Sequence, residues 1–166
     1  MDDDDASPRE LTHVTATGDA QMVDVGGKPD ASRRAVATGH IELQSATIDA
    51  VRADNVAKGD VLATARIAAI QAVKHTWEVI PLCHQIPITN VDTAFSLEES
   101  TIRMTVTVET VGKTGCEMEA LHGVSVGLNA IWDMVKAAEK DAYGQYPRTA
   151  IKDIRVTEKR VERDDA

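Results

Sequence analysis

Two hydrophobic periods follow one another between residues 102 and 138, and together they constrain the fold more than any other feature. Apolar residues occupy every second position from Ile102 to Val108, which is the pattern of a strand with one covered face. After a Gly-containing turn, apolar residues step by three and four from Leu121 to Ala138, the spacing of an amphipathic helix. The sequence therefore predicts a one-sided sheet that packs against helices.

Weaker patterns complete the order of elements. The predicted elements are a strand over 37–43, a short helix over 46–54 capped by Ser45, a long uninterrupted helix over 60–79, strands over 91–97 and 102–109, a helix over 121–138 and a last strand near 154–156. This βαββαβ order is that of the ferredoxin-like arrangement, an α+β fold with an antiparallel sheet and helices on one face. The other face would expose apolar residues, so we expect a second subunit to cover it.

The regions outside these elements are predicted to be simpler. Residues 2–5 are four consecutive aspartates, so we expect residues 1–10 to be a disordered acidic tail. Residues 11–34 are rich in Gly, Asp and Thr and are expected to be an irregular arm. The length of 166 residues suits one core, and residues 11–166 are predicted to form a single domain.

Composition excludes several classes of protein. The net charge of −9 argues against nucleic-acid binding, which needs a basic surface. No apolar run approaches the ~20 residues that span a bilayer, and the acidic start is unlike a signal peptide. Cys83 and Cys116 make no disulfide framework or CxxC motif. We therefore expect a cytoplasmic protein without nucleic-acid or membrane partners.

Two loops carry groups that could do chemistry. Pro81 stops the long helix, and Cys83 and His84 follow it. For His84 alone, a neutral imidazole bonded to a backbone carbonyl is the simpler interpretation, and Cys83 by itself is more often a small buried hydrophobe than a nucleophile. The remaining histidines lack the spacing of a zinc site, so no metal is predicted.

The second loop, residues 112–115 (Gly-Lys-Thr-Gly), precedes the last helix. It is either a plain strand-to-helix turn or a place where N–H groups at a helix start attract anionic oxygens; the P-loop spacing is absent. Glu117 and Glu119 in the first helical turn favour the helix dipole. They could equally accept hydrogen bonds from a purine or a pterin, and both interpretations remain open.

Three charged residues suggest a further polar group. Asp133 and Lys136 share the polar face of the last helix, which by itself is an ordinary solvated ion pair. Lys58 precedes a helix start, where a cation opposes the helix dipole. An anionic ligand or an acid–base role would justify its position.

In this order, these segments resemble the cyclic pyranopterin monophosphate synthase family, also called the molybdenum cofactor biosynthesis protein C family. The segments that carry the resemblance are Leu11-Thr12-His13, Met22-Val23-Asp24-Val25, Lys58-Gly59-Asp60-Val61, Ala63-Thr64-Ala65-Arg66-Ile67-Ala68, Ile80-Pro81-Leu82-Cys83-His84, Gly112-Lys113-Thr114-Gly115, Glu117-Met118-Glu119-Ala120-Leu121 and Asp133-Met134-Val135-Lys136. Together they extend over residues 11–161, nearly the whole chain.

The resemblance implies a ferredoxin-like fold, a homohexamer built as a trimer of dimers, and a lyase reaction on a small nucleotide-derived substrate. That reaction converts (8S)-3′,8-cyclo-7,8-dihydroguanosine 5′-triphosphate to cyclic pyranopterin monophosphate and diphosphate in molybdopterin biosynthesis. The resemblance also implies Asp133 as the active-site residue, with Lys58 and Lys136 as an acid–base pair. The substrate contacts that it implies are Leu82, Cys83, His84, Glu117, Met118, Glu119, Arg33 and, near the phosphates, Lys74. No cofactor is implied, because the rearrangement has no redox step, and a Mg²⁺ ion on the diphosphate has no support in the sequence.

The chain departs from the family pattern in two places. Residues 84–87 (His-Gln-Ile-Pro) replace a His-Pro-Leu run, and the family's Lys-Ser-Gly-Gly run near the carboxyl end is missing. We place the C-terminal substrate lysine at Lys159, with Lys152 as the alternative. Two rivals to a catalytic role remain: a ligand-binding module, since ferredoxin-like domains serve many functions, and a structural subunit of a cofactor-assembly complex.

Overall fold

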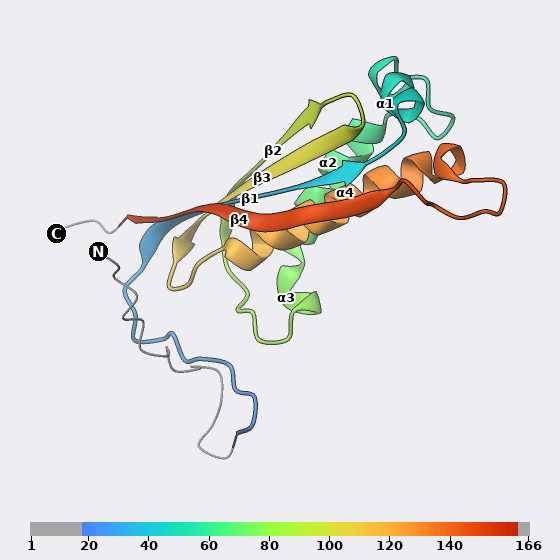
Figure 1. The fold of residues 1–166 in the computed structure, drawn as a ribbon. Coiled ribbons are helices and arrows are strands. Elements are labelled where there is room, and N and C mark those ends of the chain that lie inside the picture. Colours follow the sequence, from blue (N-terminus) through green and yellow to red (C-terminus); the bar gives the residue numbers. More distant parts are fainter. Residues whose placement is uncertain (1–17, 163–166) are drawn as a thin grey trace, which may run out of the picture.

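The computed structural model describes residues 18–162. The predicted acidic tail and the Leu11–His13 motif lie outside these residues. The elements are β1 (Ala31–Glu42), α1 (Ser45–Arg52), α2 (Val61–Lys74), α3 (Thr76–Val79), β2 (Ile88–Leu97), β3 (Thr101–Gly112), α4 (Glu117–Glu139) and β4 (Ala150–Glu162) (Figure 1). Apart from the two short helices α1 and α3, this is the predicted βαββαβ order.

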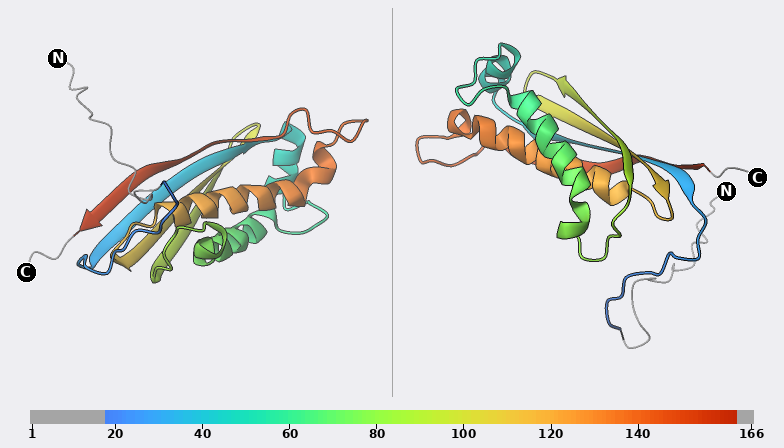
Figure 2. Two further views of the ribbon diagram at one scale, coloured as in Figure 1. Left: turned by 90° about the horizontal axis from the view of Figure 1, so that it is seen from below. Right: turned by 180° about the vertical axis from the view of Figure 1, so that it is seen from behind.

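The four strands form one antiparallel sheet in the order β2-β3-β1-β4. The two strands of each βαβ unit are therefore not neighbours: β3 lies between β1 and β2, and β1 lies between β3 and β4. Helices α2 and α4 lie on the same face of the sheet, as the views from below and behind show (Figure 2). The predicted α+β fold with helices on one face is confirmed.

The core forms where α2, α4 and β3 meet. The inward side chains of residues 102–108 are fully buried, as their alternation predicted. Gly127 of α4 lies so close to its neighbours that an added Cβ would stand 2.4 Å from the Met104 sulfur and 3.3 Å from the Ala69 Cβ. Because both positions on the helices are small, α2 and α4 pack closely over β3.

The long helix predicted over 60–79 is interrupted. Helix α2 ends at Lys74 and the separate turn α3 begins at Thr76. The buried Thr76 hydroxyl donates to the carbonyls of Ala72 (3.0 Å) and Val73 (3.3 Å). These are acceptors in the last turn of α2, so the side chain replaces continuing helical bonds. The prediction of an uninterrupted helix was wrong for this reason.

The start of α1 also differs from the prediction. The N-cap is Gln44 rather than Ser45, and it makes no side-chain capping bond. Instead, the buried carboxylate of Glu139 at the end of α4 accepts the Gln44 N–H at 3.1 and 3.3 Å. It also accepts the Thr149 hydroxyl at 2.7 Å. The N–H groups of Thr47 and Ile48, in the first turn of the helix, donate to the Gln44 carbonyl, so no side-chain cap from Ser45 is needed, and a tertiary contact holds the N-cap residue itself.

Strand β1 is longer than predicted, because it begins at Ala31 inside the expected irregular arm. It pairs with β3 along its whole length, from Ala31 opposite Gly112 to Glu42 opposite Thr101. The two consecutive charged residues Arg33 and Arg34 interrupt the apolar–polar alternation at the start of this strand. The pairing with β3 thus extends β1 over residues whose hydrophobic pattern does not predict a strand.

The open face of the sheet is more polar than expected. Its β3 positions are Thr101, Arg103, Thr105, Thr107, Glu109 and Val111. Of these six residues, Val111 is the large exposed apolar one, at 51%. Apolar exposure along β3 therefore gives little reason for a covering subunit.

Candidate active site

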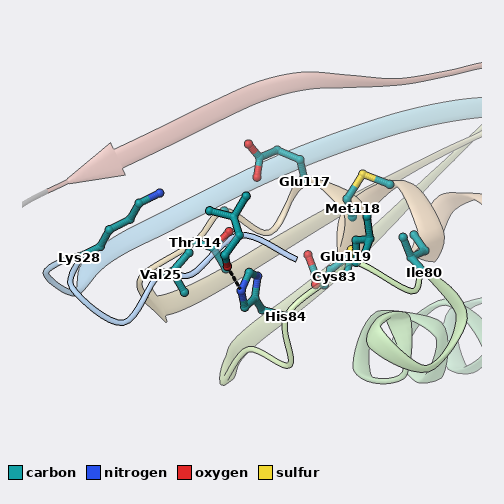
Figure 3. Close-up of a pocket in the computed structure, with 12 residues that line it drawn as sticks. Val25, Lys28, Ile80, Cys83, His84, Thr114, Glu117, Met118 and Glu119 are labelled. Atoms are coloured by element: carbon teal, nitrogen blue, oxygen red, sulfur yellow. Dashed lines mark hydrogen bonds between the residues drawn. The ribbon is translucent and has the colours of Figure 1, made fainter. Parts of the chain in front are cut away.

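A cavity of about 590 Å³ lies between the start of α4, the loop after α3 and the chain before β1 (Figure 3). Six of the predicted substrate-contacting residues line it: Leu82, Cys83, His84, Glu117, Met118 and Glu119. Val23, Val25, Lys28 and Thr114 line it as well and had not been predicted as site residues. The half-buried Val23 and Val25 alternate with exposed neighbours in the Met22–Val25 motif, which was the signal available for them.

Glu119 is the acidic group that lies deepest in this cavity. Its side chain is buried although it lies in the first turn of α4, and Figure 3 shows it beside Cys83. Burial raises the pKa of the Glu119 carboxyl from 4.5 to about 7, with a smaller contribution from the charge of Glu117. A carboxyl group with such a pKa can give or take a proton near neutral pH.

Replacing Glu119 by Gln should change how the stability depends on pH. The folded state holds the proton more tightly than the unfolded state, so this contribution to stability is complete below pH 4.5 and is lost as the pH rises to about 7. At about pH 8, Glu119→Gln should therefore be more stable than wild type by on the order of 1–3 kcal/mol, and at about pH 5 this difference should largely vanish.

Urea unfolding at both pH values measures the difference, and the exposed Glu99→Gln provides the control. A stability difference that is equal at the two pH values would show that burial does not raise the pKa of Glu119.

The two cysteines pack rather than react. Burial, followed by the charge of Glu119, raises the pKa of the half-buried Cys83 thiol. The same causes raise the pKa of the buried Cys116 to about 11, and its S–H donates to the Val108 carbonyl at 3.3 Å. Both thiols therefore stay protonated at neutral pH and lack the thiolate that a nucleophile needs.

His84 already has a hydrogen-bond partner within the chain. Its Nε2 lies 2.8 Å from the carbonyl oxygen of Val23 (Figure 3). Since a carbonyl only accepts, Nε2 carries the proton and donates it. In this state the imidazole therefore holds the wall of the cavity, as the simpler interpretation of the sequence had it.

Arg33 and Lys159 approach the cavity from the sheet. Arg33 donates to the carbonyls of Gly112 (2.9 Å) and Lys113 (3.2 Å), so it holds the loop that precedes α4. Lys159 of β4 pairs with the carboxylate of Glu117. The alternative C-terminal lysine, Lys152, pairs with Glu42 at 2.7 Å, and of the two lysines Lys159 is the one that contacts a residue of the cavity.

The second glycine of the loop before α4 gives room to the Glu117 side chain. A Cβ at Gly115 would lie 1.9 Å from a carboxylate oxygen of Glu117. The Glu117 side chain therefore folds back over Gly115, where its carboxylate pairs with Lys159, and a side chain at residue 115 would have to displace that carboxylate.

The three predicted catalytic residues form a second group, the lysine–aspartate cluster. The Asp133 carboxylate pairs with Lys58 at 2.8 Å and with Lys136 at 2.7 Å. Hydrogen bonds from Lys136 and then Lys58 lower the pKa of Asp133 to about 2, and the bond to Asp133 raises the pKa of Lys136. All three side chains are exposed. A lysine that takes part in acid–base catalysis needs a lowered pKa, so Lys136 is not tuned for this role within the single chain.

The cavity and the cluster lie at opposite ends of α4. Glu119 and Asp133 are separated by fourteen residues of one helix, or about 21 Å at 1.5 Å per residue. An acid–base group acts within hydrogen-bond distance of the reacting atom. One chain therefore cannot bring both groups to the same reacting centre.

Lys74, like Arg33 and Lys159, is a predicted site residue that neither lines the cavity nor belongs to the lysine–aspartate cluster. It borders a separate hollow between α2 and β2, together with Ile70, Ile86 and Ile88.

In the chain from residue 18 to 162, no three His, Cys, Asp or Glu side chains gather so that they could hold a metal ion. None of the helices described there is long and apolar enough to cross a membrane.

Comparisons with known proteins agree on one family. The MoaC family model matches residues 22–161. Proteins named "probable cyclic pyranopterin monophosphate synthase" from Halobacterium salinarum and Natronomonas pharaonis are 68% and 69% identical to this chain, over 95% and 90% of it and 94% of each relative. A protein from Methanothermobacter thermautotrophicus is 57% identical over 91% of this chain and 94% of its own length, and is named "probable cyclic pyranopterin monophosphate synthase accessory protein". With most of its length matched in this way, the chain belongs to the MoaC family.

Proposed function

We propose that this protein is the lyase that converts (8S)-3′,8-cyclo-7,8-dihydroguanosine 5′-triphosphate to cyclic pyranopterin monophosphate and diphosphate in molybdenum cofactor biosynthesis. The names of its relatives support this proposal. The observation that carries it is the cavity, where six predicted contact residues gather and one of them, Glu119, has a buried carboxyl group with a pKa of about 7.

The chemistry of this reaction suits the residues present. Opening the imidazole ring, closing the pyran ring and forming the cyclic phosphate all move protons between nitrogen and oxygen atoms. Glu119 can hold or release a proton at the buried end of the cavity. Cations have to neutralise the triphosphate, and Lys28 lies at the cavity while Lys159 lies next to Glu117 on its border.

We further propose a homohexamer, in which the lysine–aspartate cluster of one chain completes the cavity of another. The distance along α4 and the exposure of the cluster support this arrangement. A covering chain would exclude water from Lys58 and Lys136 and bring cations near them. Both effects lower the pKa of a lysine, whereas in the single chain the pKa of Lys136 is raised.

The assembly is directly measurable. Multi-angle light scattering at micromolar concentration should give a single species with six times the mass of the chain. A stable monomer at that concentration would contradict the composite site.

We also propose that the protein is cytoplasmic, because its two cysteines are free thiols and free thiols persist in a reducing compartment.

The reaction itself is tested with purified protein and the cyclic dihydroguanosine triphosphate. Diphosphate release should be followed by a pyrophosphatase-coupled phosphate assay and the pterin product by mass spectrometry. Parallel reactions with Mg²⁺ and with EDTA test the prediction that no metal is required, and both are followed by mass spectrometry of the pterin, because the coupling pyrophosphatase itself needs Mg²⁺. Calorimetry on the same samples measures substrate binding.

The principal rival is a binding module or accessory subunit, which the name of the Methanothermobacter relative brings into consideration. That rival predicts heat of binding from a folded oligomer without diphosphate release. Diphosphate and pterin formed in equal amounts by the protein alone would exclude it.

A further inference from the structure

We propose that Lys113 is a positioning residue, which holds residues 19–30, here called the strap, as one wall of the cavity. Its effect on substrate binding rests on the proposed function, whereas its effect on the strap does not. Val23, Val25 and Lys28 of the strap line the cavity. Their placement therefore decides the shape of that wall and where the Lys28 ammonium lies.

Lys113 contacts the strap through two short hydrogen bonds. Its Nζ donates to the carbonyl oxygen of Gly26 at 2.9 Å and to that of Lys28 at 2.6 Å. An ammonium group has three N–H donors and no acceptor, so two of its three bonds go to the strap. Hydrogen bonds from a charged donor are stronger than neutral ones, and both are made to the main chain, where they fix the backbone.

The base of Lys113 is itself held in place. Arg33 of β1 donates to the main-chain carbonyls of Gly112 and Lys113 at 2.9 and 3.2 Å. Gly112 is the last residue of β3 and pairs with Ala31 at the start of β1. The lysine thus extends from the end of the central strand β3 toward a segment that has little regular structure.

The strap contains a compact turn that is held by the rest of the chain on two sides. An internal bond from the Gly26 N–H to the Asp24 carboxylate (2.8 Å) and another from the Lys28 N–H to the Val25 carbonyl (3.0 Å) form a compact turn. His84 holds this turn on one side, at the Val23 carbonyl, and Lys113 holds it on the other. Val23 and Val25 are half-buried, while the other residues of the strap are exposed.

This placement decides between two roles for the lysine in the Gly-Lys-Thr-Gly loop. A phosphate-binding lysine would direct its ammonium toward the cavity. Lys113 does not line the cavity, and its ammonium contacts carbonyl oxygens of the strap. It therefore acts on the ligand through Lys28 and the two valines rather than by contact.

Hydrogen–deuterium exchange on the free protein tests the positioning. Lys113→Met keeps the length of the side chain and removes its donors, so amide exchange in a peptide covering residues 19–30 should accelerate by about tenfold or more, the scale of a lost charge-assisted hydrogen bond. Lys113→Arg keeps donors and charge and should restore most of the protection. Lys140→Met is the matched control, because Lys140 is exposed just beyond α4 and its loss should leave exchange in the strap unchanged.

Kinetics with the cyclic dihydroguanosine triphosphate separate positioning from plain stability. Lys113→Met should raise KM by about tenfold while kcat stays within about threefold, and Lys113→Arg should recover KM. Unchanged exchange in Lys113→Met overturns the proposal, whatever the activity. If the Met variant unfolds, Lys113→Gln is measured in its place under the same criterion. Faster exchange in a protein that releases no diphosphate even as wild type would retain Lys113 as the holder of the strap and reject the proposed function alone.

Discussion

Asp133→Asn should lower turnover by roughly 10²-fold or more, the usual scale for a lost acid–base group. The carboxylate lies between Lys58 and Lys136, at 2.8 and 2.7 Å. With a pKa of about 2 it is ionised at every pH at which the enzyme would work. The amide keeps the shape but cannot neutralise or orient the two ammonium groups. Steady-state diphosphate release measures the loss.

The melting temperature of Asp133→Asn should change little, since exposed ion pairs contribute little to stability. Asp49→Asn is the matched control, because Asp49 and Arg52 form an exposed i, i+3 pair on α1 at 3.3 Å. That variant should keep wild-type turnover. If Asp133→Asn also stays within about threefold of wild type, Asp133 is only part of a surface ion-pair group.

Two inactive variants should restore activity when they assemble together. The first carries His84→Ala and Glu119→Gln, which damage the cavity, and the second carries Lys58→Ala and Lys136→Ala, which damage the cluster. In a mixed dimer with two shared sites, one site receives the intact cavity and the intact cluster, and the other receives neither. Random pairing makes half of the dimers mixed, so total activity should recover to about a quarter of wild type.

Co-expression with two different affinity tags and tandem purification provides the mixed oligomers. Each variant purified alone should be inactive, and mixing the two after assembly, without subunit exchange, provides the negative control. Mixed oligomers that stay inactive, although each variant folds and assembles, would indicate that the cavity and the cluster do not serve one site.

The fold was largely predictable, because its strongest elements follow from local periodicity. The alternation from Ile102 to Val108 and the stepping apolar residues of α4 point to the faces that are buried in the structure. The errors fall where a tertiary contact replaces a local preference. Thr76 takes the helical acceptors at the end of α2, and the contact of Glu139 with the Gln44 N–H holds Gln44 as the N-cap of α1 in place of Ser45.

The site was predictable as a set of residues but not as an arrangement. The loop at Cys83 and His84 and the first turn of α4 meet in one cavity, as their resemblance to a family implied. The strap was not foreseen, since its order comes from Lys113 and His84, which are distant in sequence. The burial of Glu119 was equally hidden, because an acidic residue in a first helical turn has a sufficient reason to be exposed.

Because α4 is uninterrupted between Glu119 and Asp133, insertions and deletions within it have a different effect from substitutions. A substitution on the helix changes one contact, but an inserted or deleted residue moves everything after it by about 1.5 Å and turns it by about 100°. Asp133 would then leave the polar face, and Val135 would leave the core, where it is now buried. Exposed positions of this helix can therefore vary in composition, whereas a change in its length would alter the distance between the cavity and the lysine–aspartate cluster, which the proposed composite site requires to be fixed.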